Sequence, residues 1–451
     1  MNSILLKAAS VLSVLSCLAG CAGNDEVSAV WTEGETDPET GRAVHTLTII
    51  NAPEGTDWAV WMTSNHIDSG MADGTEGTVE LFHGCLYKMT PMERKGKDLI
   101  VKYTDRPLQR HCWAPEGIAL EQDGKVTPLN VKYEFLPSEN IPDFPYNQVE
   151  TEVWDMIPSL KNVTPAEGVT VVEDMPQVEF VDSDKAGWYR IVLDGTCSVQ
   201  ASDEDGAWYA QVTLENLKRN AGGNEIPNMV IEDWPDLGYR GFMLDISRNF
   251  TTKDNILRFI DLLAHYKVNV FHLHFGDDEG WRVEIEKFPE LTTFGAYHEF
   301  PYKNEDGEYV EENYLMPSYN GGMDPEDMSS SANGHLTKED YIEILKYAWE
   351  RRISVIPEFD TPGHSRAAIK AMDAYSERVG NDEFRLSDPE DRSEYCSVQY
   401  YRDNALNVAL PSTYRFIEEV FDALIAYHKE AGVPLPAIHV GGDEVASGAW
   451  T

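Results

Sequence analysis

The sequence predicts an α/β protein whose C-terminal half alternates strands with helices, preceded by two smaller domains. At 451 residues, the chain is longer than one hydrophobic core usually fills. From about residue 240, apolar runs alternate with stretches of helical period, which is typical of a (β/α)8 barrel or a doubly wound sheet. Before about residue 150, short β-prone runs recur between Gly, Asp and Pro clusters, which indicates a small β-sandwich.

Four strands and three helices are expected in the alternating region. The strands cover 241–246, 268–275, 353–359 and 437–441. One helix should begin after Thr252 and a second at Thr337 with Asp340. The third should contain 416–426, which carries an apolar face. Because each strand is followed by a helix, right-handed crossovers should bring the strands together as one parallel sheet.

Two domains are expected before this region. β-prone runs at 46–50, 58–62, 79–82 and 99–103 place a β-rich domain at 44–137. A strand at 188–193 ends at an Asp-Gly turn, and a helical stretch carrying Ala210, Leu214 and Leu217 follows it. This pattern predicts a small α+β domain at 145–235 and leaves 236–451 for the strand–helix units.

The N-terminus has the pattern of an export signal over 1–20. Lys7 precedes an apolar stretch at 8–18 that is too short to span a bilayer. It leads into Leu18-Ala19-Gly20-Cys21, which resembles the bacterial lipobox, so acylation of Cys21 would anchor the protein to a membrane. Ala22 after the cysteine indicates an outer-membrane lipoprotein facing the periplasm or the cell surface. The polar, acidic residues 21–43 should form a tether.

The net charge and the cysteine content limit which partners, disulfides and metals are expected. Lys and Arg number 36 against 78 Asp and Glu, a formal net charge of −42 that disfavours a nucleic-acid partner. Export permits disulfides, and only Cys85 and Cys112 fall in one expected domain. Since no CxxC or Cys/His spacing indicates zinc, neither a metal nor a cofactor is expected.

Carboxylates follow three of the four expected strands. They are Asp277-Asp278, Glu358 and Asp360 with His364 beyond, and Asp443-Glu444. In a parallel barrel these carboxyl ends meet at one mouth, where active sites are built. Adjacent carboxylates in a confined site cannot both ionise freely, so one should hold a proton, as a general acid does.

Neighbouring carboxylates do not fit the opposed pair of an ordinary glycosidase, but they suit substrate assistance. The acetamido oxygen of an N-acetylated sugar would attack the anomeric carbon. Asp443 would stabilise the oxazolinium that forms, and Glu444 would protonate the leaving oxygen.

His-x-Gly-Gly-Asp-Glu at 439–444 resembles the signature of glycoside hydrolase family 20, and three upstream motifs resemble that family in the same order. They lie at 233–248, 272–282 and 357–364. The resemblance implies a (β/α)8 barrel with a chitobiase-like β domain at its N-terminal side. It also implies retaining hydrolysis of terminal β-linked N-acetylglucosamine or N-acetylgalactosamine. The chain stops after the fourth strand, so about half of an eight-stranded barrel is expected, as in a fragment of a longer product.

The resemblance also assigns roles to further residues. Arg240 should bind the outer hydroxyls of the sugar, for which a planar guanidinium is suited. Asp277, His364 and Glu444 should form a linked chain that tunes the proton of the acid, with Asp360 nearby. His272 and His274 share one strand face, and we interpret them as barrel core beneath the site.

Three alternatives stay open at this point. Gly-Gly-Asp-Glu at 441–444 is close to a motif of diguanylate cyclases, but an exported acidic lipoprotein is the wrong host for a cytosolic nucleotide enzyme. The His-x-His strand at 272–274 is similar to that of metal-dependent amidohydrolases, and chelator sensitivity would separate the two. A surface lipoprotein that holds glycans without cleaving them is the third.

Overall fold

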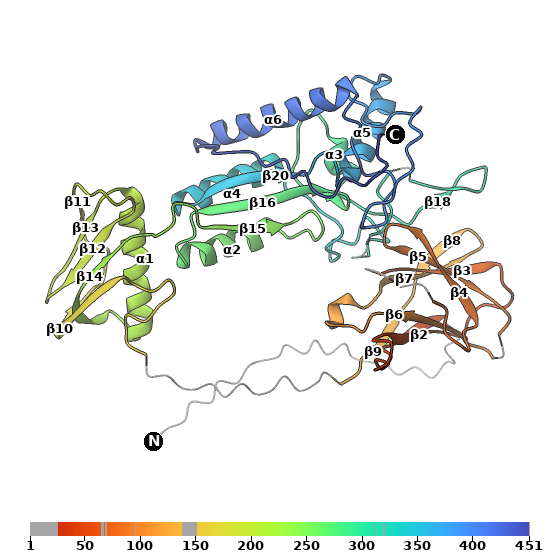
Figure 1. The fold of residues 1–451 in the computed structure, drawn as a ribbon, viewed down its shortest axis with the longest axis horizontal. Helices are drawn as coiled ribbons and strands as arrows, with labels where there is room; N and C mark the ends of the chain where they lie inside the picture. Colours follow the sequence, from red (N-terminus) through yellow and green to blue (C-terminus); the bar gives the residue numbers. More distant parts are fainter. Residues whose placement is uncertain are drawn as a thin grey trace.

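A computed structural model provides the fold of the protein, and three folded units follow one another along the chain (Figure 1). It describes residues 26–450 apart from 65–66, 68–69, 95, 138–150, 312 and 319–320. The expected signal segment and Cys21 therefore lie outside the described residues. Within the described part of the chain, every helix is too short or too polar to cross a bilayer.

Two β-sheets form the N-terminal unit. The first has the order β6-β2-β1-β9 and consists of β1 (Ser28–Thr32), β2 (Ala43–Ile50), β6 (Leu99–Asp105) and β9 (Val131–Glu134). The second has the order β4-β5-β3-β7-β8 and consists of β3 (Trp58–Thr63), β4 (Gly77–His83), β5 (Leu86–Pro91), β7 (Glu116–Gln122) and β8 (Lys125–Pro128). Both sheets contribute to one buried cluster, including Trp31, Val60 and Val101, so the unit is a sandwich.

The expectation of a tether over 21–43 is wrong for 28–32, which form β1. This strand pairs antiparallel with β2 and parallel with β9. Only Ala29 and Trp31 are buried, and the Trp31 indole donates a hydrogen bond of 2.8 Å to the Tyr103 hydroxyl. The strand is held by these two pairings and by burial of the large Trp31 indole, and its short apolar pattern lies between acidic residues.

The disulfide considered for Cys85 and Cys112 is not present. Cys85 is buried beside the β4–β5 turn, whereas Cys112 is exposed on a short 3-10 helix at His111–Trp113, and no disulfide joins the two.

The α+β unit is a five-stranded sheet crossed by one helix. Its order is β10-β14-β12-β13-β11, with β10 (Asn162–Val171), β11 (Val178–Phe180), β12 (Tyr189–Leu193), β13 (Cys197–Ala201) and β14 (Glu225–Asp233). Helix α1 (Glu204–Ala221) begins after Asp203, whose side chain accepts from the Gly206 amide, and ends at left-handed Gly222. Ala210, Leu214 and Leu217 are buried on its sheet-facing side, as the sequence predicts.

The C-terminal unit contains three parallel strands with β16 in the middle. They are β15 (Gly241–Asp245), β16 (Val270–Asp277) and β20 (Ser354–Phe359), and β17 (Gly280–Trp281) pairs back onto the end of β16. The helices and the small hairpin around them are α2 (Lys253–His265), α3 (Glu290–Thr293), β18 (Tyr302–Lys303), β19 (Tyr309–Val310), α4 (Lys338–Glu350), α5 (Arg366–Val379) and α6 (Pro411–Ala431). Helix α4 packs between α2 and α6. This arrangement confirms the α/β class.

The threonines at the starts of α2 and α4 differ in whether their side chains cap the helix. Thr337 forms the expected capping box with Asp340 at the start of α4. Thr252 stands at the N-cap of α2, but its side chain makes no capping hydrogen bond.

The prediction of a fourth strand over 437–441 is wrong, because this segment forms only a single β-bridge, between Glu358 and His439. The His439 amide donates to Pro357 O at 2.9 Å, and the Thr361 amide donates to Val440 O at 2.9 Å. Gly441 and Gly442 then take φ values of +64° and +104°, which turn the chain out of the extended conformation and end the pairing.

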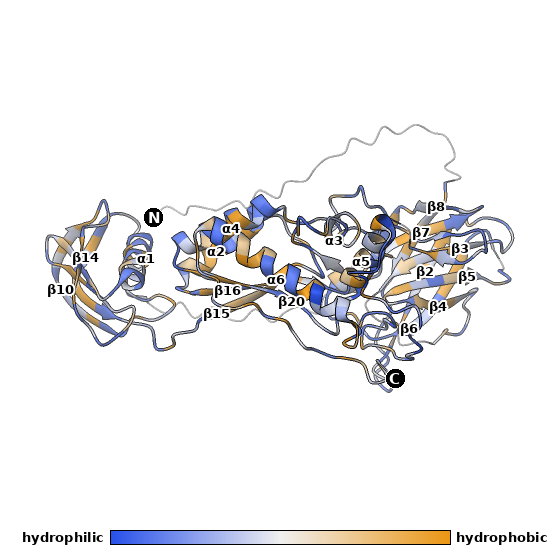
Figure 2. Ribbon diagram, turned by 90° about the horizontal axis from the view of Figure 1, so that it is seen from above, coloured by the Kyte–Doolittle hydropathy of each residue, from blue (hydrophilic) through white to orange (hydrophobic). Residues whose placement is uncertain are grey.

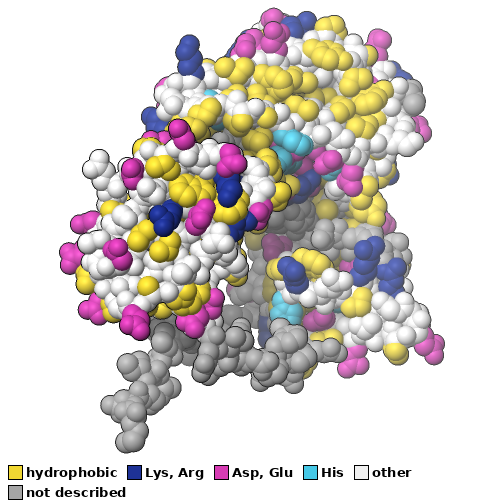
Figure 3. All heavy atoms as spheres, turned by 60° about the vertical axis from the view of Figure 1, so that its left-hand side comes forward, with side chains coloured by type: hydrophobic (Ala, Val, Ile, Leu, Met, Phe, Trp, Pro, Cys, Tyr) yellow, Lys and Arg dark blue, Asp and Glu magenta, His cyan; other side chains and the backbone are white. Residues whose placement is uncertain are grey.

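The sandwich and the α+β unit lie at opposite ends of the C-terminal unit in both ribbon views (Figures 1 and 2). The sandwich lies near α5 and the carboxyl ends of the strands, whereas α1 lies near their amino ends. Acidic side chains are spread over the visible face of the molecule, as the net charge of −42 requires (Figure 3).

Candidate active site

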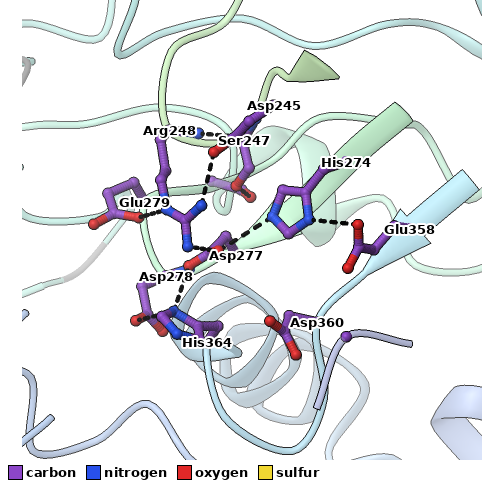
Figure 4. A network of polar contacts seen from close by, with 12 residues as sticks. Asp245, Ser247, Arg248, His274, Asp277, Asp278, Glu279, Glu358, Asp360 and His364 are labelled. Atoms are coloured by element: carbon purple, nitrogen blue, oxygen red, sulfur yellow. Dashed lines mark hydrogen bonds and ion pairs between the residues drawn. The ribbon is translucent and has the colours of Figure 1, made fainter. Parts of the chain in front are cut away.

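Charged side chains from three neighbouring strands gather where those strands end (Figure 4). Asp245 closes β15, Asp277 closes β16, and Asp360 comes directly after β20. Parallel strands bring their carboxyl ends to one edge of the sheet, so the fold places these carboxylates together. The expectation that acids after successive strands meet at one mouth is met by the structure.

Asp277 lies at the centre of the network and is only 2% exposed. It contacts His274 Nε2 and His364 Nδ1, each at 3.1 Å, and forms an ion pair with Arg248. Burial alone would raise the pKa of Asp277, but the hydrogen bonds from the two histidines and the Arg248 charge hold it below its usual value. Asp277 therefore stays a carboxylate at any physiological pH.

His364 links this buried carboxylate to Glu444. Its Nδ1 faces Asp277, while its Nε2 lies 3.4 Å from Glu444 Oε2. Burial opposes the charged ring, but hydrogen bonds to Asp277 and Asp278 raise the pKa of His364 to about 11. The structure thus brings Asp277, His364 and Glu444 into one chain of contacts, in the order that the sequence motifs imply.

Glu444 is the solvent-facing member of that chain. Its side chain is 49% exposed and accepts a hydrogen bond of 3.0 Å from Gln399. Both His364 and Glu444 have positive φ angles, +50° and +45°. Such left-handed conformations are unfavourable for these residue types and are held by surrounding structure, which is common where side chains are aimed for chemistry.

Asp360 and Asp443 lie on either side of the glycine turn. Asp360 is 3% exposed, and its Oδ1 accepts from the Gly442 amide at 2.8 Å. Burial raises the pKa of Asp360 to about 6, and the nearby Asp277 and Asp443 charges add to the rise. A Cβ on Gly441 would overlap the Asp360 carboxylate, so this turn requires glycine. Asp443 itself is exposed.

The role expected for Arg240 is wrong, because this residue precedes β15 and lies at the amino ends of the strands. Its guanidinium donates to Lys267 O at 2.9 Å, Leu237 O at 2.6 Å and the Tyr209 hydroxyl at 2.6 Å. The mouth lies five residues further along the strand, roughly 16 Å away. Arg240 therefore joins the C-terminal unit to α1 and does not reach the site.

Arg248 occupies the mouth instead, although the sequence motifs alone assigned it no role. It pairs with Asp245 at 2.8 Å, contacts Asp277, and lies 3.8 Å from Glu279. Its place three residues after a strand's carboxyl end was the available signal, since that end is where a parallel sheet presents its ligands.

His272 and His274 lie beneath the mouth, as the sequence predicts, whereas Glu358, which was expected among the acids of the mouth, lies inside β20 and pairs with these histidines. Glu358 contacts His272 at 2.6 Å, His274 at 3.2 Å and His439 at 2.8 Å. Burial disfavours a charged His274, but hydrogen bonds to Asp277 and Glu358 raise the pKa of that ring to about 10. His274 therefore connects the core to the site rather than only filling space.

Two groups among the described residues bring possible metal-ligand atoms within 4.8 Å of one another. They are His272 with Glu358 and His439, and Asp277 with Asp278 and His364. In both groups the histidines already contact the carboxylates, and Arg248 supplies a cation to Asp277.

Comparisons with known proteins agree with this geometry. The model of the glycosyl hydrolase family 20 catalytic domain matches residues 237–451, and that of domain 2 of the same family matches 149–234. This chain belongs to glycosyl hydrolase family 20. The matched regions contain every residue of the site described above.

The curated relatives include two enzymes of Vibrio species. A β-hexosaminidase of Vibrio vulnificus is 41% identical over 279 residues, which is 59% of this chain and 31% of the relative. The N,N'-diacetylchitobiase of Vibrio harveyi is 39% identical over 293 residues, 61% of this chain and 32% of the relative. The chain thus spans about a third of the length of these curated relatives.

Among solved structures, a family 20 exo-β-N-acetylglucosaminidase from Vibrio harveyi matches with a TM-score of 0.72. The match covers 94% of this chain and 69% of that one, at 24% sequence identity. It shows that the two chains share a fold.

Proposed function

We propose that the protein is a retaining β-N-acetylhexosaminidase, which removes terminal non-reducing N-acetylhexosamine from β-linked glycans. The observation that carries the proposal is the contact chain from Asp277 through His364 to Glu444 at the mouth of a parallel sheet. The names of the family 20 relatives, β-hexosaminidase and N,N'-diacetylchitobiase, support it. We include in the proposal that the parallel strands belong to a (β/α)8 barrel.

Glu444 is the proposed general acid. It donates its proton to the leaving glycosidic oxygen and becomes a carboxylate. His364, which keeps its positive charge because Asp277 and Asp278 raise its pKa to about 11, lies 3.4 Å away and compensates the negative charge that appears on Glu444. Asp277 in turn holds the ring in place through Nδ1. The contact chain therefore favours proton transfer to the substrate.

Asp443 is the proposed partner of the acetamido group. The acetamido oxygen attacks the anomeric carbon, the bond to the leaving oxygen breaks, and the positive charge that forms is shared by an oxazolinium ring. Asp443 then stabilises the ring N–H. Water then adds to the anomeric carbon from the β face and gives a proton to the Glu444 carboxylate, while the bond from that carbon to the acetamido oxygen breaks, so the product keeps the β configuration. Asp360 lies behind the glycine turn and fixes the backbone that carries Asp443.

Arg248 is the proposed contact for the sugar hydroxyls, in place of Arg240. Its guanidinium is held by Asp245 and Asp277, so its orientation is set before a ligand arrives. A planar fork with fixed acidic partners presents its donors at low entropic cost.

We also propose export and anchoring of the protein to the outer membrane through acylated Cys21. The apolar stretch at 8–18 and the lipobox-like Leu18-Ala19-Gly20-Cys21 support this proposal. Cys21→Ser should move the protein from the membrane to the soluble fraction, and continued membrane association would contradict the anchor.

The test of the activity compares aryl β-N-acetylglucosaminide with aryl β-glucoside, which lacks the acetamido group. Hydrolysis of the first only, with the β-anomer seen first by proton NMR, is expected because the acetamido oxygen is the nucleophile. Aryl β-N-acetylgalactosaminide in parallel reports the sugar preference. Equal cleavage of the β-glucoside would contradict substrate assistance. Binding of N-acetylglucosamine without hydrolysis would favour the glycan-binding alternative.

A further inference from the structure

The tip of the β4–β5 hairpin of the sandwich contacts the C-terminal unit close to the site. Gly84, with φ of +52°, packs so closely on the Tyr401 ring that a Cβ there would overlap it. The neighbouring His83 ring lies 5.4 Å from the Tyr401 ring, and its Nε2 is 3.4 Å from Asp403. Two residues of the N-terminal domain thus meet one short segment of the C-terminal one.

That segment, loop 397–404, holds three of the carboxylates at the mouth. Gln399 donates to Glu444 at 3.0 Å, and Asn404 donates to the buried Asp278 at 2.8 Å. The hydroxyl of Tyr401, which is 3% exposed, donates to Glu279 at 3.4 Å. The loop is closed on itself by the Ser397 amide, which donates to Tyr401 O at 2.8 Å.

A second set of contacts runs between the same two domains. Tyr309, on the β18–β19 hairpin, packs edge-on against Trp61 and Phe82 of the sandwich. Its hydroxyl donates to Glu121 of β7. This packing holds the β18–β19 hairpin against the sandwich, and Glu311 follows directly after the hairpin.

Two residues after Tyr309, Glu311 accepts two hydrogen bonds of 2.7 Å from Arg366. The Arg366 side chain also binds Asp403 of loop 397–404, and its backbone amide donates to Asp278 at 3.1 Å. Both sets of contacts therefore end on the carboxylates of the mouth.

We propose that the β4–β5 hairpin tip of the N-terminal sandwich holds loop 397–404 in place, and that Tyr401 is a positioning residue for the acid Glu444. The sandwich is then part of the catalytic scaffold rather than a separate module. The effect on catalysis rests on the proposed hydrolase function, whereas the effect on the loop does not. Because Gln399 and the Tyr401 ring share one short loop, a shift of the ring displaces the donor that orients Glu444.

The test uses two glycines at hairpin tips of the sandwich. Gly84→Ala and Gly124→Ala both add a methyl group at positive φ, +52° and +72°, so the backbone strain is comparable. Only the methyl at 84 meets Tyr401, since nothing lies within 4 Å of a Cβ at 124. Gly124→Ala is therefore the matched control.

Hydrogen exchange of the full chain reads out the loop without any need for activity. Gly84→Ala should raise the exchange rate of amides in 397–404 by about tenfold or more over the control, because the Ser397–Tyr401 pairing opens more often. Equal exchange in the two variants would overturn the positioning role. Should Gly84→Ala fail to fold, His83→Ala, which only removes contacts, should loosen the loop in the same direction, and wild-type exchange in that variant would overturn the proposal.

Steady-state kinetics test whether the contact between the hairpin tip and loop 397–404 affects the general acid Glu444. In Gly84→Ala, kcat on a poor leaving group should fall roughly tenfold to a hundredfold below the control, and much less on a good leaving group. Equal losses on both, with a loosened loop, would overturn the link to Glu444. If the wild-type chain hydrolyses no N-acetylhexosaminide, the proposed function fails, while the exchange result still decides whether the hairpin holds the loop.

Discussion

The two ends of strand β15 carry one arginine each, and they differ in what surrounds them. Arg240, at the amino end, gives its donors to backbone carbonyls and a tyrosine hydroxyl, and nearby Lys267 is buried with Asp233 and Tyr189. Arg248, at the carboxyl end, lies among several acidic side chains (Figure 4).

At the carboxyl end of the strands, burial shifts the pKa of acidic side chains away from their usual values. Burial raises the pKa of Glu279 to about 8, and one of its oxygens has no hydrogen-bond partner among the described residues. The polar groups of Arg240 and Lys267 at the amino end have partners within the protein, whereas Glu279 at the carboxyl end keeps one buried oxygen without a hydrogen bond in the described part of the chain. The comparison teaches that the strand end, rather than membership of a motif, decides whether a charged residue serves stability or chemistry.

The largest expected difference is between the two arginines themselves. Arg248→Gln should lower kcat/KM about a thousandfold, because it removes both the proposed sugar contact and the charge that balances Asp277. Arg240→Gln should leave kcat/KM of the folded protein within about threefold of wild type. Steady-state kinetics on an aryl N-acetylglucosaminide measures both, and a greater loss in Arg240→Gln would reverse the comparison.

A stability effect without a catalytic one is expected at the amino end. Asp233→Asn leaves the buried Lys267 without its anionic partner, so the free energy of unfolding should fall by about 3 kcal/mol. Below the unfolding transition, kcat should stay unchanged. Urea unfolding with parallel kinetics tests this, and a large drop in kcat at full folding would place the pair in the catalytic machinery.

The opposite pattern is expected for Asp360→Asn at the carboxyl end. The pKa of Asp360 is raised to about 6 from an ordinary value near 3.8, so the folded state binds more protons between these values. Stability therefore falls as the pH rises from about 4 to 6, by no more than about 3 kcal/mol. Asparagine has no such dependence and can still accept from Gly442.

The Asp360→Asn variant should consequently be more stable than wild type at pH 7 and no more stable at pH 3.5, while losing activity. Thermal unfolding across this range measures the effect, with the exposed Glu305→Gln as control. A variant less stable than wild type at pH 7 would show that the Asp360 charge is compensated.

Much of the fold was predictable from local pattern. The strands at 241–246, 268–275 and 353–359 have strong apolar runs, and the carboxylates directly after them fixed the position of the mouth. Prediction failed where the decisive contact is distant. Trp31 is held by Tyr103, 72 residues away, so β1 left no visible period in an acidic stretch. At 441–442, the glycines that signal ligand approach also end the strand before it can extend.

The two arginines show a second limit. Both stand within the same family-like stretch at 233–248, so motif matching alone did not separate them, and only strand direction does. The support for the site from Tyr401 and Asn404 was not predictable at all, because these residues reach Glu279 and Asp278 over more than 120 positions of the chain.

The most direct test of the account is the effect of Glu444→Gln on two leaving groups. Glutamine keeps the shape and the contact with Gln399 but has no proton to give, so only protonation of the leaving oxygen is lost. We expect kcat/KM to fall roughly a hundredfold to ten-thousandfold on a 4-methoxyphenyl N-acetylglucosaminide, and less than about tenfold on the 2,4-dinitrophenyl glycoside. Equal losses on the two substrates would contradict the assignment of Glu444 as the acid at the end of the Asp277–His364 chain.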